Sequence, residues 1–400
     1  MLRVKDYIKG DLFLWALVVA LSVFSFLPVY SASTNLAYLH GGEGETASYL
    51  IRHAFHLGMG ILVVYLAHKI PYNYFKALSL LALPVIVILL VFTAFQGNQM
   101  DGANANRWLR IPMIGIGFQT STLASVVLLV YVAKYLNSIK DKVITFKQSL
   151  VPLWLPVSIV LGLILPANFS TTALIFATVL LLCFIGGYPW KYLVAIIGAG
   201  IFSLLIFMGT AKLLPGVFPN RVDTWVSRVE TFMGDGNSDT MYQVDKAKTA
   251  ISTGELFGVG PGKSQQKYFL PQSSSDFIYA IIIEEYGAAG GIVIVLVYML
   301  VLFRLSIIAY KADTLFGTLV VVGVGFPIVL QALINMCVAV NILPVTGQTL
   351  PFISSGGTSI WMTALAIGIV LSVSAKREVL RTQALEEDDM NPLDILSEAL

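Results

Sequence analysis

Long apolar segments dominate this chain, and they constrain its fold more than any single motif does. Ten such segments recur along the 400 residues, each close to the ~20 residues that a helix needs to cross a hydrocarbon core about 30 Å thick. Hydrophobic residues make up 57% of the chain and charged residues 12%, a composition unsuited to a soluble surface. The sequence therefore predicts an all-α polytopic membrane protein. The predicted spans are 11–30, 53–70, 77–95, 111–133, 150–166, 171–187, 191–212, 277–303, 315–340 and 358–375.

The distribution of Lys and Arg predicts how these spans are oriented. An even number of spans puts both termini on one side, and that side carries 15 of the 25 basic residues, against 3 on the other side outside the long loop. The excess of positive charge marks the cytoplasmic side. We therefore expect one membrane domain over 1–375, with 213–276 as a large extracytoplasmic loop, and a cytoplasmic tail over 376–400. A net charge of +2 gives no reason to expect nucleic acid as a partner.

A short stretch at the end of the long loop concentrates three acids. Asp276 follows three consecutive serines, where the polar loop meets an apolar run, and Glu284 and Glu285 fall inside that run. At 1.5 Å per residue, the two glutamates are expected about 12–13 Å deeper in the membrane than Asp276. Ionisable groups inside a membrane segment are costly, so this stretch is a candidate functional site.

Each of these acids has two interpretations. Asp276 has the context of an N-cap residue, which accepts hydrogen bonds from the first amides of a helix. A single carboxylate near several extracytoplasmic cations also suits base-assisted attack on a centre whose leaving group is a phosphate. Glu284 and Glu285 are either buried acids that hold helices together or part of a polar inner site, with Arg52 as a candidate partner.

The glycine-rich stretch 258–264 is not a nucleotide-binding P-loop, because Phe257 stands where the first glycine is required. Its amides, together with Lys263 and Lys267, could bind a phosphate. The alternative is a tight turn with solvated lysines. The spacing of His, Cys and acidic residues fits neither a Ser/His/Asp nucleophile system nor a metal site, so no metal ligand is predicted.

These motifs resemble the SEDS (shape, elongation, division and sporulation) family of polytopic membrane enzymes, and the resemblance covers nearly the whole chain. Its motifs lie in the long loop, in the stretch that contains the three acids, and around the last three predicted spans. The matching residues are Gly254-Glu255-Leu256 with Gly258, Gln266-Lys267, Leu270-Pro271, Asp276-Phe277-Ile278, Glu284-Glu285, Arg107-Trp108, Gln331-Ala332 with Asn335, Leu343-Pro344, Gly347 with Thr349-Leu350-Pro351, and Ser354-Ser355.

The resemblance implies a peptidoglycan glycosyltransferase that polymerises lipid II, with undecaprenyl pyrophosphate as the leaving group and inversion at the anomeric carbon. It implies that Asp276 is the catalytic acid. No cofactor is predicted with certainty, and whether a divalent cation, Mg²⁺ or Mn²⁺, assists the pyrophosphate is left open. The residues expected to bind substrate are Arg52, Arg107, Lys263, Lys267, Glu284, Glu285, Gln331, Asn335, Thr349, Ser354 and Ser355.

The resemblance also implies a place and partners. The segment 347–351 is more similar to the division-type members, FtsW, than to the elongation-type members, RodA, so we expect a role in septal cell-wall synthesis. The location implied is the bacterial cytoplasmic membrane, with both termini cytoplasmic and the active site facing outward. The expected partners are lipid II, a class B penicillin-binding protein and other membrane proteins of the division machinery.

Four positions depart from the family pattern. Thr122 and Ser125 replace an acid and a lysine that are usual at the start of the fourth span, and their joint loss resembles removal of an internal ion pair. Asn168 replaces an aspartate before the sixth span, so any role of that aspartate as a charge is in doubt. Ser355 stands where an aromatic residue commonly precedes the glycine pair.

Three other functions are compatible with the same residues. The first is a lipid II flippase, a transporter that would use Glu284 or Glu285 as a moving charge. The second is an elongation-type polymerase. The third is a scaffold that recruits the transpeptidase without doing chemistry itself.

Overall fold

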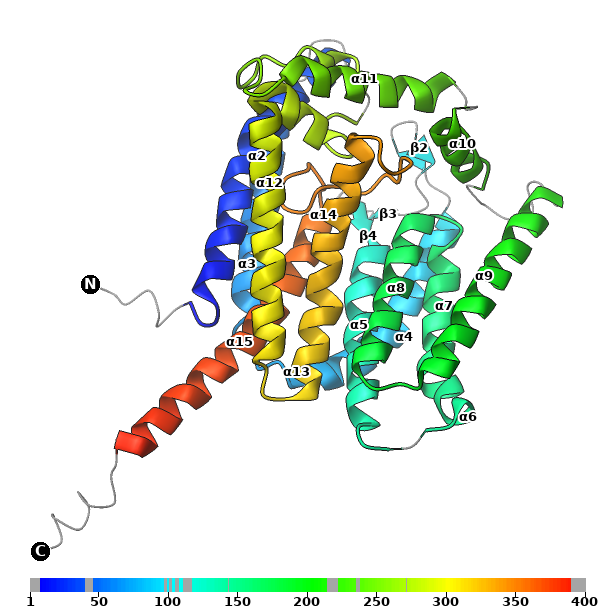
Figure 1. Cartoon of the computed structure of the whole chain (residues 1–400), viewed down its shortest axis with the longest axis vertical. Coiled ribbons are helices and arrows are strands. Elements are labelled where there is room, and N and C mark those ends of the chain that lie inside the picture. Colours follow the sequence, from blue (N-terminus) through cyan, green and yellow to red (C-terminus); the bar gives the residue numbers. More distant parts are fainter. Residues whose placement is uncertain are drawn as a thin grey trace, which may run out of the picture.

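A computed structural model shows the chain as a bundle of long, roughly parallel helices with smaller elements gathered at one end (Figure 1). The structure describes residues 8–39, 46–96, 99–100, 103–104, 108–110, 117–142, 144–213, 222–234, 238–270 and 272–389. Within these ranges nine helices are long and apolar enough to cross a membrane. A tenth apolar helix, α8, is shorter at 17 residues.

Ten helical segments correspond to the ten predicted spans, two of them interrupted by a π-helical turn just before or at a proline. The helices of the bundle are α2 (Leu12–Leu39), α3 (Thr46–Ala67), α4 (Tyr74–Gln96), α5 (Thr120–Ser138), α6 (Phe146–Ser149) with η1 (Leu150–Trp154) and α7 (Leu155–Ile164), α8 (Phe169–Ile185), α9 (Trp190–Leu213), α12 (Ile278–Tyr310), α13 (Leu315–Val320) with η3 (Val321–Gly325) and α14 (Phe326–Ala339), and α15 (Ser359–Asp389). The predicted all-α membrane fold is confirmed. Helix α15 continues past the predicted end of its span, through the first part of the expected tail.

One predicted span is wrong in detail. The span expected over 111–133 has its helix beginning at Thr120, because residues 117–119 form a strand instead. The long loop contains α10 (Val222–Met233), α11 (Ser238–Gly254) and the 3₁₀ turn η2 (Gln266–Tyr268). The short strands form two antiparallel pairs, β1 (Gln99–Met100) with β2 (Ala103–Asn104), and β3 (Trp108–Arg110) with β4 (Gly117–Gln119).

Helix α12 is the largest departure from the predicted topology, because it is broken and folded back on itself. Gly287 has φ 71° and ψ −179°, values that no helical residue adopts. The hydroxyl of Tyr279 donates to the carbonyl of Gly291 over 3.1 Å, although 12 residues of continuous helix would separate them by about 18 Å. Residues 278–286 therefore form a short helix that runs antiparallel to the start of the membrane helix 288–310.

The backbone groups freed by this break are satisfied by the loop that follows α11. The amides of Val259 and Gly260 donate to the carbonyls of Glu284 and Glu285 over 2.9 and 3.0 Å. In return, the amides of residues 288 and 289 donate to the carbonyls of residues 255 and 256 over 2.8 and 3.1 Å. A break inside a membrane protein is stable only where such partners exist. The loop and the helical hairpin thus form one unit.

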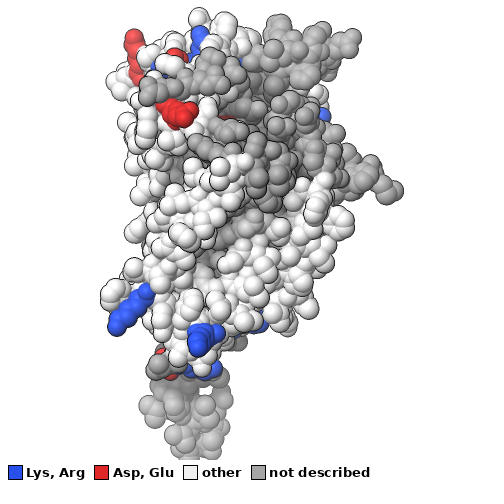
Figure 2. Space-filling model, turned by 90° about the vertical axis from the view of Figure 1, so that its right-hand side faces the viewer, with Lys and Arg blue, Asp and Glu red and all other residues white. Residues whose placement is uncertain are grey.

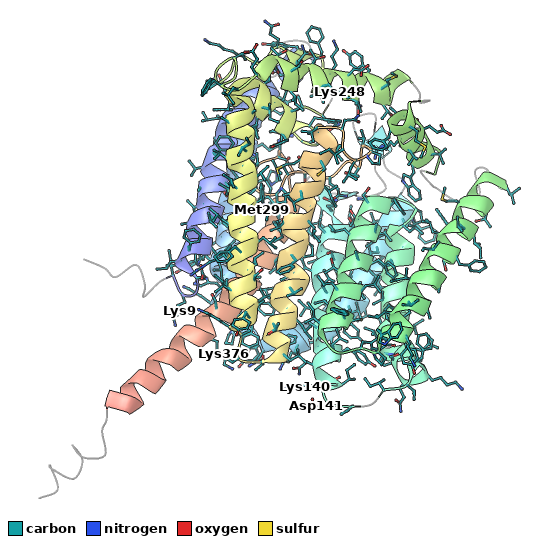
Figure 3. All side chains as sticks on the ribbon, in the orientation of Figure 1. Lys9, Lys140, Asp141, Lys248, Met299 and Lys376 are labelled. Atoms are coloured by element: carbon teal, nitrogen blue, oxygen red, sulfur yellow. The ribbon has the colours of Figure 1, made fainter. Side chains whose placement is uncertain are left out.

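The charged residues labelled in Figure 3 lie at the two ends of the bundle. Figure 3 places Lys9, Lys140 and Lys376 at one end, which we call the terminal end, and Lys248 at the other, which we call the loop end. Met299 lies between them on α12. On the face shown in Figure 2, the described residues between the two ends form a broad band without Lys, Arg, Asp or Glu. This arrangement is typical of a multi-pass membrane protein.

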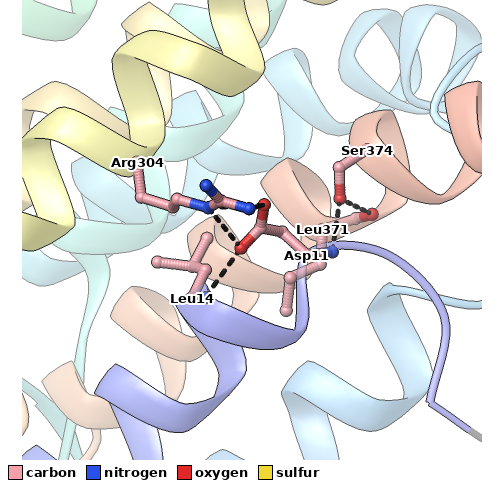
Figure 4. Close-up of polar contacts among 5 residues, drawn as sticks. All are labelled: Asp11, Leu14, Arg304, Leu371 and Ser374. Carbon is pink, nitrogen blue, oxygen red and sulfur yellow. Dashed lines mark hydrogen bonds and ion pairs between the residues drawn. The ribbon is translucent and has the colours of Figure 1, made fainter. Parts of the chain in front are cut away.

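One ion pair holds three helices together near the terminal end (Figure 4). Arg304 of α12 contacts the Asp11 carboxylate, with a nitrogen to oxygen distance of 2.7 Å. Asp11 also caps α2, because its Oδ1 accepts from the amide of Leu14 over 2.8 Å. The Asp11 amide donates to Ser374 Oγ of α15 over 2.9 Å. The pair therefore fixes the membrane helix 288–310 against the first and last helices of the bundle.

Candidate active site

A cavity of about 800 Å³ lies within the bundle and contains Asp276 in its wall. It is bounded by α3, α5, α8, α14 and α15, by the turn before α12, by the segment before α15 and by residues of α10 and α11. Its polar lining includes Arg52, His56, Gln119, Thr122, Ser125, Asn168, Arg228, Gln243, Gln272, Asp276, Gln331, Gln348, Thr349 and Ser355, and its apolar lining includes Val126, Leu174, Ile175, Val324, Ile328 and Ala366.

Asp276 is the only acid among the described residues that line this cavity, which makes it the candidate for chemistry. A Cβ atom built on Gly347 would lie 3.4 Å from Asp276 Oδ2 and 3.7 Å from a terminal nitrogen of Arg228. Gly347 has φ 69°, so a side chain there would be strained and would lie against both charged groups. The Asp276 carboxylate and the Arg228 guanidinium therefore both lie next to Gly347.

The structure places Phe277, and not Asp276, at the N-cap position of α12. Phe277 has φ −113° and ψ 17°, and its side chain makes no capping hydrogen bond. Asp276, one residue earlier, lines the cavity. The interpretation of Asp276 as a general base remains a prediction.

Side chains from two other segments hold the backbone of the Asp276 turn in place. Asn335 of α14 donates to the carbonyl of Asp276 over 2.8 Å and to that of Gln348 over 2.7 Å. Ser354 donates to the carbonyl of Ser275 over 2.6 Å. Asn335 and Ser354, both predicted to bind substrate, are not among the residues that line the cavity. They position the turn that carries the acid.

Four other predicted substrate-binding residues do line the cavity, namely Arg52, Gln331, Thr349 and Ser355. Gln331 donates from Nε2 to the carbonyl of Thr349 over 2.8 Å and to its hydroxyl over 3.3 Å. Arg107, also predicted to bind substrate, lies outside the described residues. The structure thus brings together residues from distant parts of the chain around Asp276.

Glu284 and Glu285 do not line the cavity, and the prediction that they lie deeper than Asp276 is wrong. Because the chain reverses at Gly287, they lie at the opposite end of the short helix 278–286, against the loop. Glu284 accepts from Ser264 Oγ and from the amides of Gln265 and Gln266, the latter two over 2.9 and 3.2 Å. Glu285 accepts from Ser31 Oγ of α2. Both are at most 1% exposed and tie the loop to the bundle.

The proposed phosphate-binding loop is likewise part of the scaffold. The backbone amides of Val259 and Gly260 already donate hydrogen bonds to carbonyl groups of the helical hairpin. Lys267 is buried, and its Nζ donates to the carbonyl of Gly262 over 2.8 Å and to Ser31 Oγ over 3.2 Å. The exposed Lys263 is not among the cavity residues. The two lysines are therefore placed away from Asp276.

The four positions that depart from the family pattern all line the cavity. Thr122 and Ser125 line it from α5, where they leave a neutral polar wall. Asn168 lines it too and caps α8, because its Oδ1 accepts from the amide of Thr171 over 3.2 Å. An aspartate at this position could make the same cap, so the cap explains why asparagine is tolerated.

The residues expected to bind substrate did not include several that line the cavity, among them His56, Arg228, Gln243, Gln272 and Gln348. Arg228 and Gln243 belong to α10 and α11, helices of the long loop that contribute to the cavity wall. Gln272 has φ 59°, an uncommon backbone conformation that also marks the turn before Asp276. Among the described residues, no cluster of three or more His, Cys, Asp or Glu side chains could hold a metal ion.

This arrangement can support proton transfer beside an anionic group. A carboxylate in the wall of a shielded cavity can accept a proton, and the Arg228 and Arg52 guanidinium groups can stabilise negative charge that develops nearby. The deeper apolar lining by α5, α8 and α14 can accommodate a hydrocarbon chain. The cavity therefore suits an amphipathic substrate with an anionic head.

Comparison with curated proteins gives relatives of similar length. A protein of Hydrogenovibrio crunogenus named "Probable peptidoglycan glycosyltransferase FtsW" is 32% identical over 367 residues, covering 89% of this chain and 90% of that protein. A protein of Allochromatium vinosum with the same name is 32% identical over 392 residues, covering 96% and 94%. Stage V sporulation protein E of Bacillus subtilis is 29% identical over 366 residues, covering 91% and 96%.

Solved structures share the fold. A chain from a study of the coordination of polymerization and crosslinking by a peptidoglycan synthase complex has a TM-score of 0.69 and 24% identity, with 92% of this chain and 98% of that chain covered. The rod shape determining protein RodA of Thermus thermophilus has a TM-score of 0.65 and 24% identity, with 93% and 99% covered. The family model of FtsW, RodA and SpoVE, described as "Cell cycle protein", matches residues 11–379. This chain is a member of the FtsW/RodA/SpoVE family, the SEDS family.

Proposed function

We propose that this chain is a peptidoglycan glycosyltransferase that polymerises lipid II into glycan strands. The observation that carries the proposal is the cavity, in which one carboxylate, Asp276, lies beside Arg228 while the membrane helices supply an apolar wall. A disaccharide joined through a diphosphate to a long hydrocarbon chain has the matching distribution of polar and apolar groups. The names of the relatives from Hydrogenovibrio and Allochromatium support the same activity.

In this mechanism Asp276 is the general base. It accepts the proton of the 4-hydroxyl group on the acceptor's GlcNAc as that oxygen attacks the anomeric carbon of the donor's MurNAc. The new glycosidic bond forms while the bond from the anomeric carbon to the diphosphate oxygen breaks, with inversion at carbon. The diphosphate leaves with the bonding electron pair, and Asp276 then releases its proton to solvent. General acid–base catalysis of this kind contributes about 10²- to 10⁴-fold.

Arg228 and Arg52 stabilise the negative charge in this scheme, since both line the cavity. Charge stabilisation by fixed donors is strongest where water is excluded. Gln331 and Thr349 present polar groups at the same wall and bind the sugars or the peptide. The scheme places no step on a metal ion, and a divalent cation on the diphosphate would add to the arginines.

The location follows from the basic residues. Lys9, Lys140 and Lys376 lie at the terminal end of the bundle, which by the charge rule is the cytoplasmic end. The loop end, with α10, α11 and the turn before α12, then lies outside the bacterial cytoplasmic membrane. Asp276 reacts with substrate at that outer face. The long loop 213–276 is the extracytoplasmic part of a single membrane domain, and the tail from 376 is cytoplasmic.

The physiological role we propose is septal wall synthesis with a class B penicillin-binding protein and other membrane proteins of the division machinery. Support comes from the FtsW names of the relatives and from the solved structure that concerns both polymerization and crosslinking. The elongation-type role is the alternative within the family. Complementation of depletion strains for each role distinguishes them.

The test is a polymerisation assay with the purified full-length chain, its transpeptidase and fluorescent lipid II. We expect glycan strands from the wild type and none from Asp276→Ala. Glu230→Gln, which changes an exposed acid of α10 outside the cavity, is the matched control and should polymerise normally. Strands of undiminished length and rate from Asp276→Ala would remove the enzymatic role of this acid.

The same preparation tests the transporter alternative. A flippase moves lipid II across liposome membranes without making strands, and it requires no general base. Wild-type protein that translocates lipid II, makes no strands and keeps its transport rate in Asp276→Ala would replace the glycosyltransferase with a flippase.

A further inference from the structure

Two histidines of α3, His53 and His56, have different surroundings. His53 of α3 is 2% exposed, and its Nε2 is 2.8 Å from Ser25 Oγ of α2. His56, three residues further on, lines the cavity, and the structure gives its side chain no hydrogen bond to any residue that it describes. Helix packing accounts for His53. It does not account for the polar edge of His56.

The His56 ring is held in place by aromatic contacts. Its centroid lies 5.4 Å from the Trp361 ring and 5.7 Å from the Phe55 ring. The Trp361 indole donates to the His56 carbonyl over 3.2 Å, which ties α15 to α3 at this point. Phe55 also lines the cavity. A ring fixed in this way is already oriented for a ligand, so little rotamer freedom is lost on binding.

The surroundings of the two ring nitrogens indicate which one can serve a ligand. Nδ1 of His56 is shielded from solvent and has no partner among the described residues. A shielded N–H without an acceptor costs more than a shielded acceptor without a donor, so the proton of the neutral ring belongs on Nε2. Nε2–H is then the polar group that this side chain offers to the cavity.

Arg52 lies one helical turn before His56 and lines the same cavity. Residues four apart on a helix share a face, with Cβ atoms about 5–6 Å apart. This face of α3 therefore presents a guanidinium and an imidazole N–H, both donors, beside each other. An anion whose oxygens lie on two neighbouring phosphorus atoms, a diphosphate, matches that spacing better than a monophosphate.

We propose that His56 is a specificity-determining residue that donates from Nε2 to one phosphate of a lipid-linked diphosphate while Arg52 engages the other. This inference rests on the proposed function, which supplies the diphosphate. Asp276 serves the sugar end of the reaction, Arg228 stabilises the developing negative charge, and the Arg52–His56 pair selects diphosphate over monophosphate. His56 contacts substrate without taking part in proton transfer to the acceptor.

Binding of short lipid phosphates to the full-length protein in detergent tests the proposal. The probes are farnesyl diphosphate and farnesyl monophosphate, and the readout is the ratio of their dissociation constants. A hydrogen bond to a charged group is worth about 1.5–3 kcal/mol, so His56→Phe should weaken diphosphate binding by roughly 10-fold or more and reduce the preference for diphosphate. His56→Gln, whose amide can donate, should recover most of the preference.

Two variants control for packing. His53→Gln alters the neighbouring buried histidine and should leave the preference for diphosphate unchanged. His56→Met removes the donor with a flexible side chain, and it replaces His56→Phe if the latter does not yield folded protein. A wild-type preference for diphosphate in a folded His56→Phe or His56→Met protein would overturn the proposal, as would the absence of any preference in the wild type.

Polymerisation kinetics separate this inference from the proposed function. With lipid II as substrate, His56→Phe should raise KM by about 10-fold while kcat stays within about twofold, because the lost contact serves binding. Normal strand synthesis with an unchanged KM in His56→Phe would defeat the His56 inference and leave the enzyme intact. Wild-type protein that makes no strands, yet loses its preference for diphosphate on His56→Phe, would defeat the proposed function and leave the binding site intact.

Discussion

The two ends of the short helix 278–286 carry the same chemical group in opposite settings. At one end the Asp276 carboxylate faces an 800 Å³ cavity beside Arg228. At the other end Glu284 and Glu285 are enclosed by the loop, where hydroxyl and amide groups donate to them. A buried acid with such partners stabilises the fold, whereas an acid in a cavity wall is available to a substrate. The comparison supports the proposed role of Asp276 in chemistry and gives the glutamates a structural role.

The reversal at Gly287 creates this difference. In a straight helix the glutamates would lie within the membrane, two turns beyond Asp276. The reversal returns them to the loop, where the exchanged backbone hydrogen bonds and the carboxylates close a single unit. The four predictions that follow break or sharpen the contrast between the two ends, from the largest expected effect to the smallest.

Gly287→Ala should have the largest effect, because it removes the reversal itself. The residue has φ 71°, and a Cβ atom would lie 2.2 Å from the Leu256 carbonyl oxygen. Strain and overlap together should cost more than about 3 kcal/mol. We expect little monodisperse protein on size-exclusion chromatography. Gly198→Ala, on a helix with open space around the added methyl, should behave as wild type. Equal yields and melting temperatures for the two variants would contradict the role of the reversal.

Glu284→Gln should destabilise the end of the short helix that carries the two glutamates and spare the end that carries Asp276. The Glu284 carboxylate accepts hydrogen bonds from Ser264 Oγ and from two backbone N–H groups. The glutamine side chain would place its own NH₂ group against these donors. The expected loss is about 1–3 kcal/mol of unfolding free energy, seen as a lower Tm in detergent. Glu255→Gln, an exposed acid of the same loop, should not lower Tm. An unchanged Tm in Glu284→Gln would mean that the network contributes nothing.

Asn335→Ala should reduce the activity that depends on Asp276 without unfolding the protein. Asn335 donates to the Asp276 and Gln348 carbonyls, so its loss releases the turn that carries the acid. Misplacement of a catalytic group costs activity more than stability, and we expect kcat to fall roughly 10-fold with KM nearly unchanged. Leu330→Ala, an exposed position on the same helix, is the control. A wild-type kcat in Asn335→Ala would show that the turn keeps its position unaided.

The smallest expected effect is a pH dependence of stability caused by Lys267, which lies near the two glutamates. Burial lowers the pKa of Lys267, and Glu285 and Glu284 only partly offset this. The unfolded chain then binds more protons than the folded chain between the lowered pKa and the ordinary value of 10.5, so this group's contribution to stability rises with pH in that window. The Tm of wild type relative to Lys267→Met should therefore increase as pH rises toward 10.5. A difference that is flat or falls would contradict the sign.

The sequence predicted the bundle well because hydropathy and charge are local properties. It identified the spans, the acid at the loop junction, and four lining residues, Arg52, Gln331, Thr349 and Ser355. It placed Glu284 and Glu285 wrongly, because the apolar residues from Ile278 lead directly into the apolar helix that follows, and only tertiary partners of Gly287 reveal the break. A conformation that depends on distant backbone groups leaves no periodic pattern in a single sequence.

The same limit explains the residues that were missed. His56 is one of several histidines on or near apolar helices, and only its spacing of four residues from Arg52 separates it from His53 along the chain. Arg228 belongs to a loop helix that the hydropathy pattern does not reveal. The fold brings both residues to the wall that contains Asp276.

The most direct test of the contrast measures strand synthesis and thermal stability in Asp276→Asn and Glu284→Gln side by side. Asparagine keeps the size of the side chain and removes the base, so the rate per folded molecule should fall by at least about 100-fold while Tm stays at the wild-type value. Glu284→Gln should show the reverse, a lower Tm with a near-normal rate per folded molecule. Strand synthesis at the wild-type rate by folded Asp276→Asn would contradict the assignment of chemistry to this end of the helix.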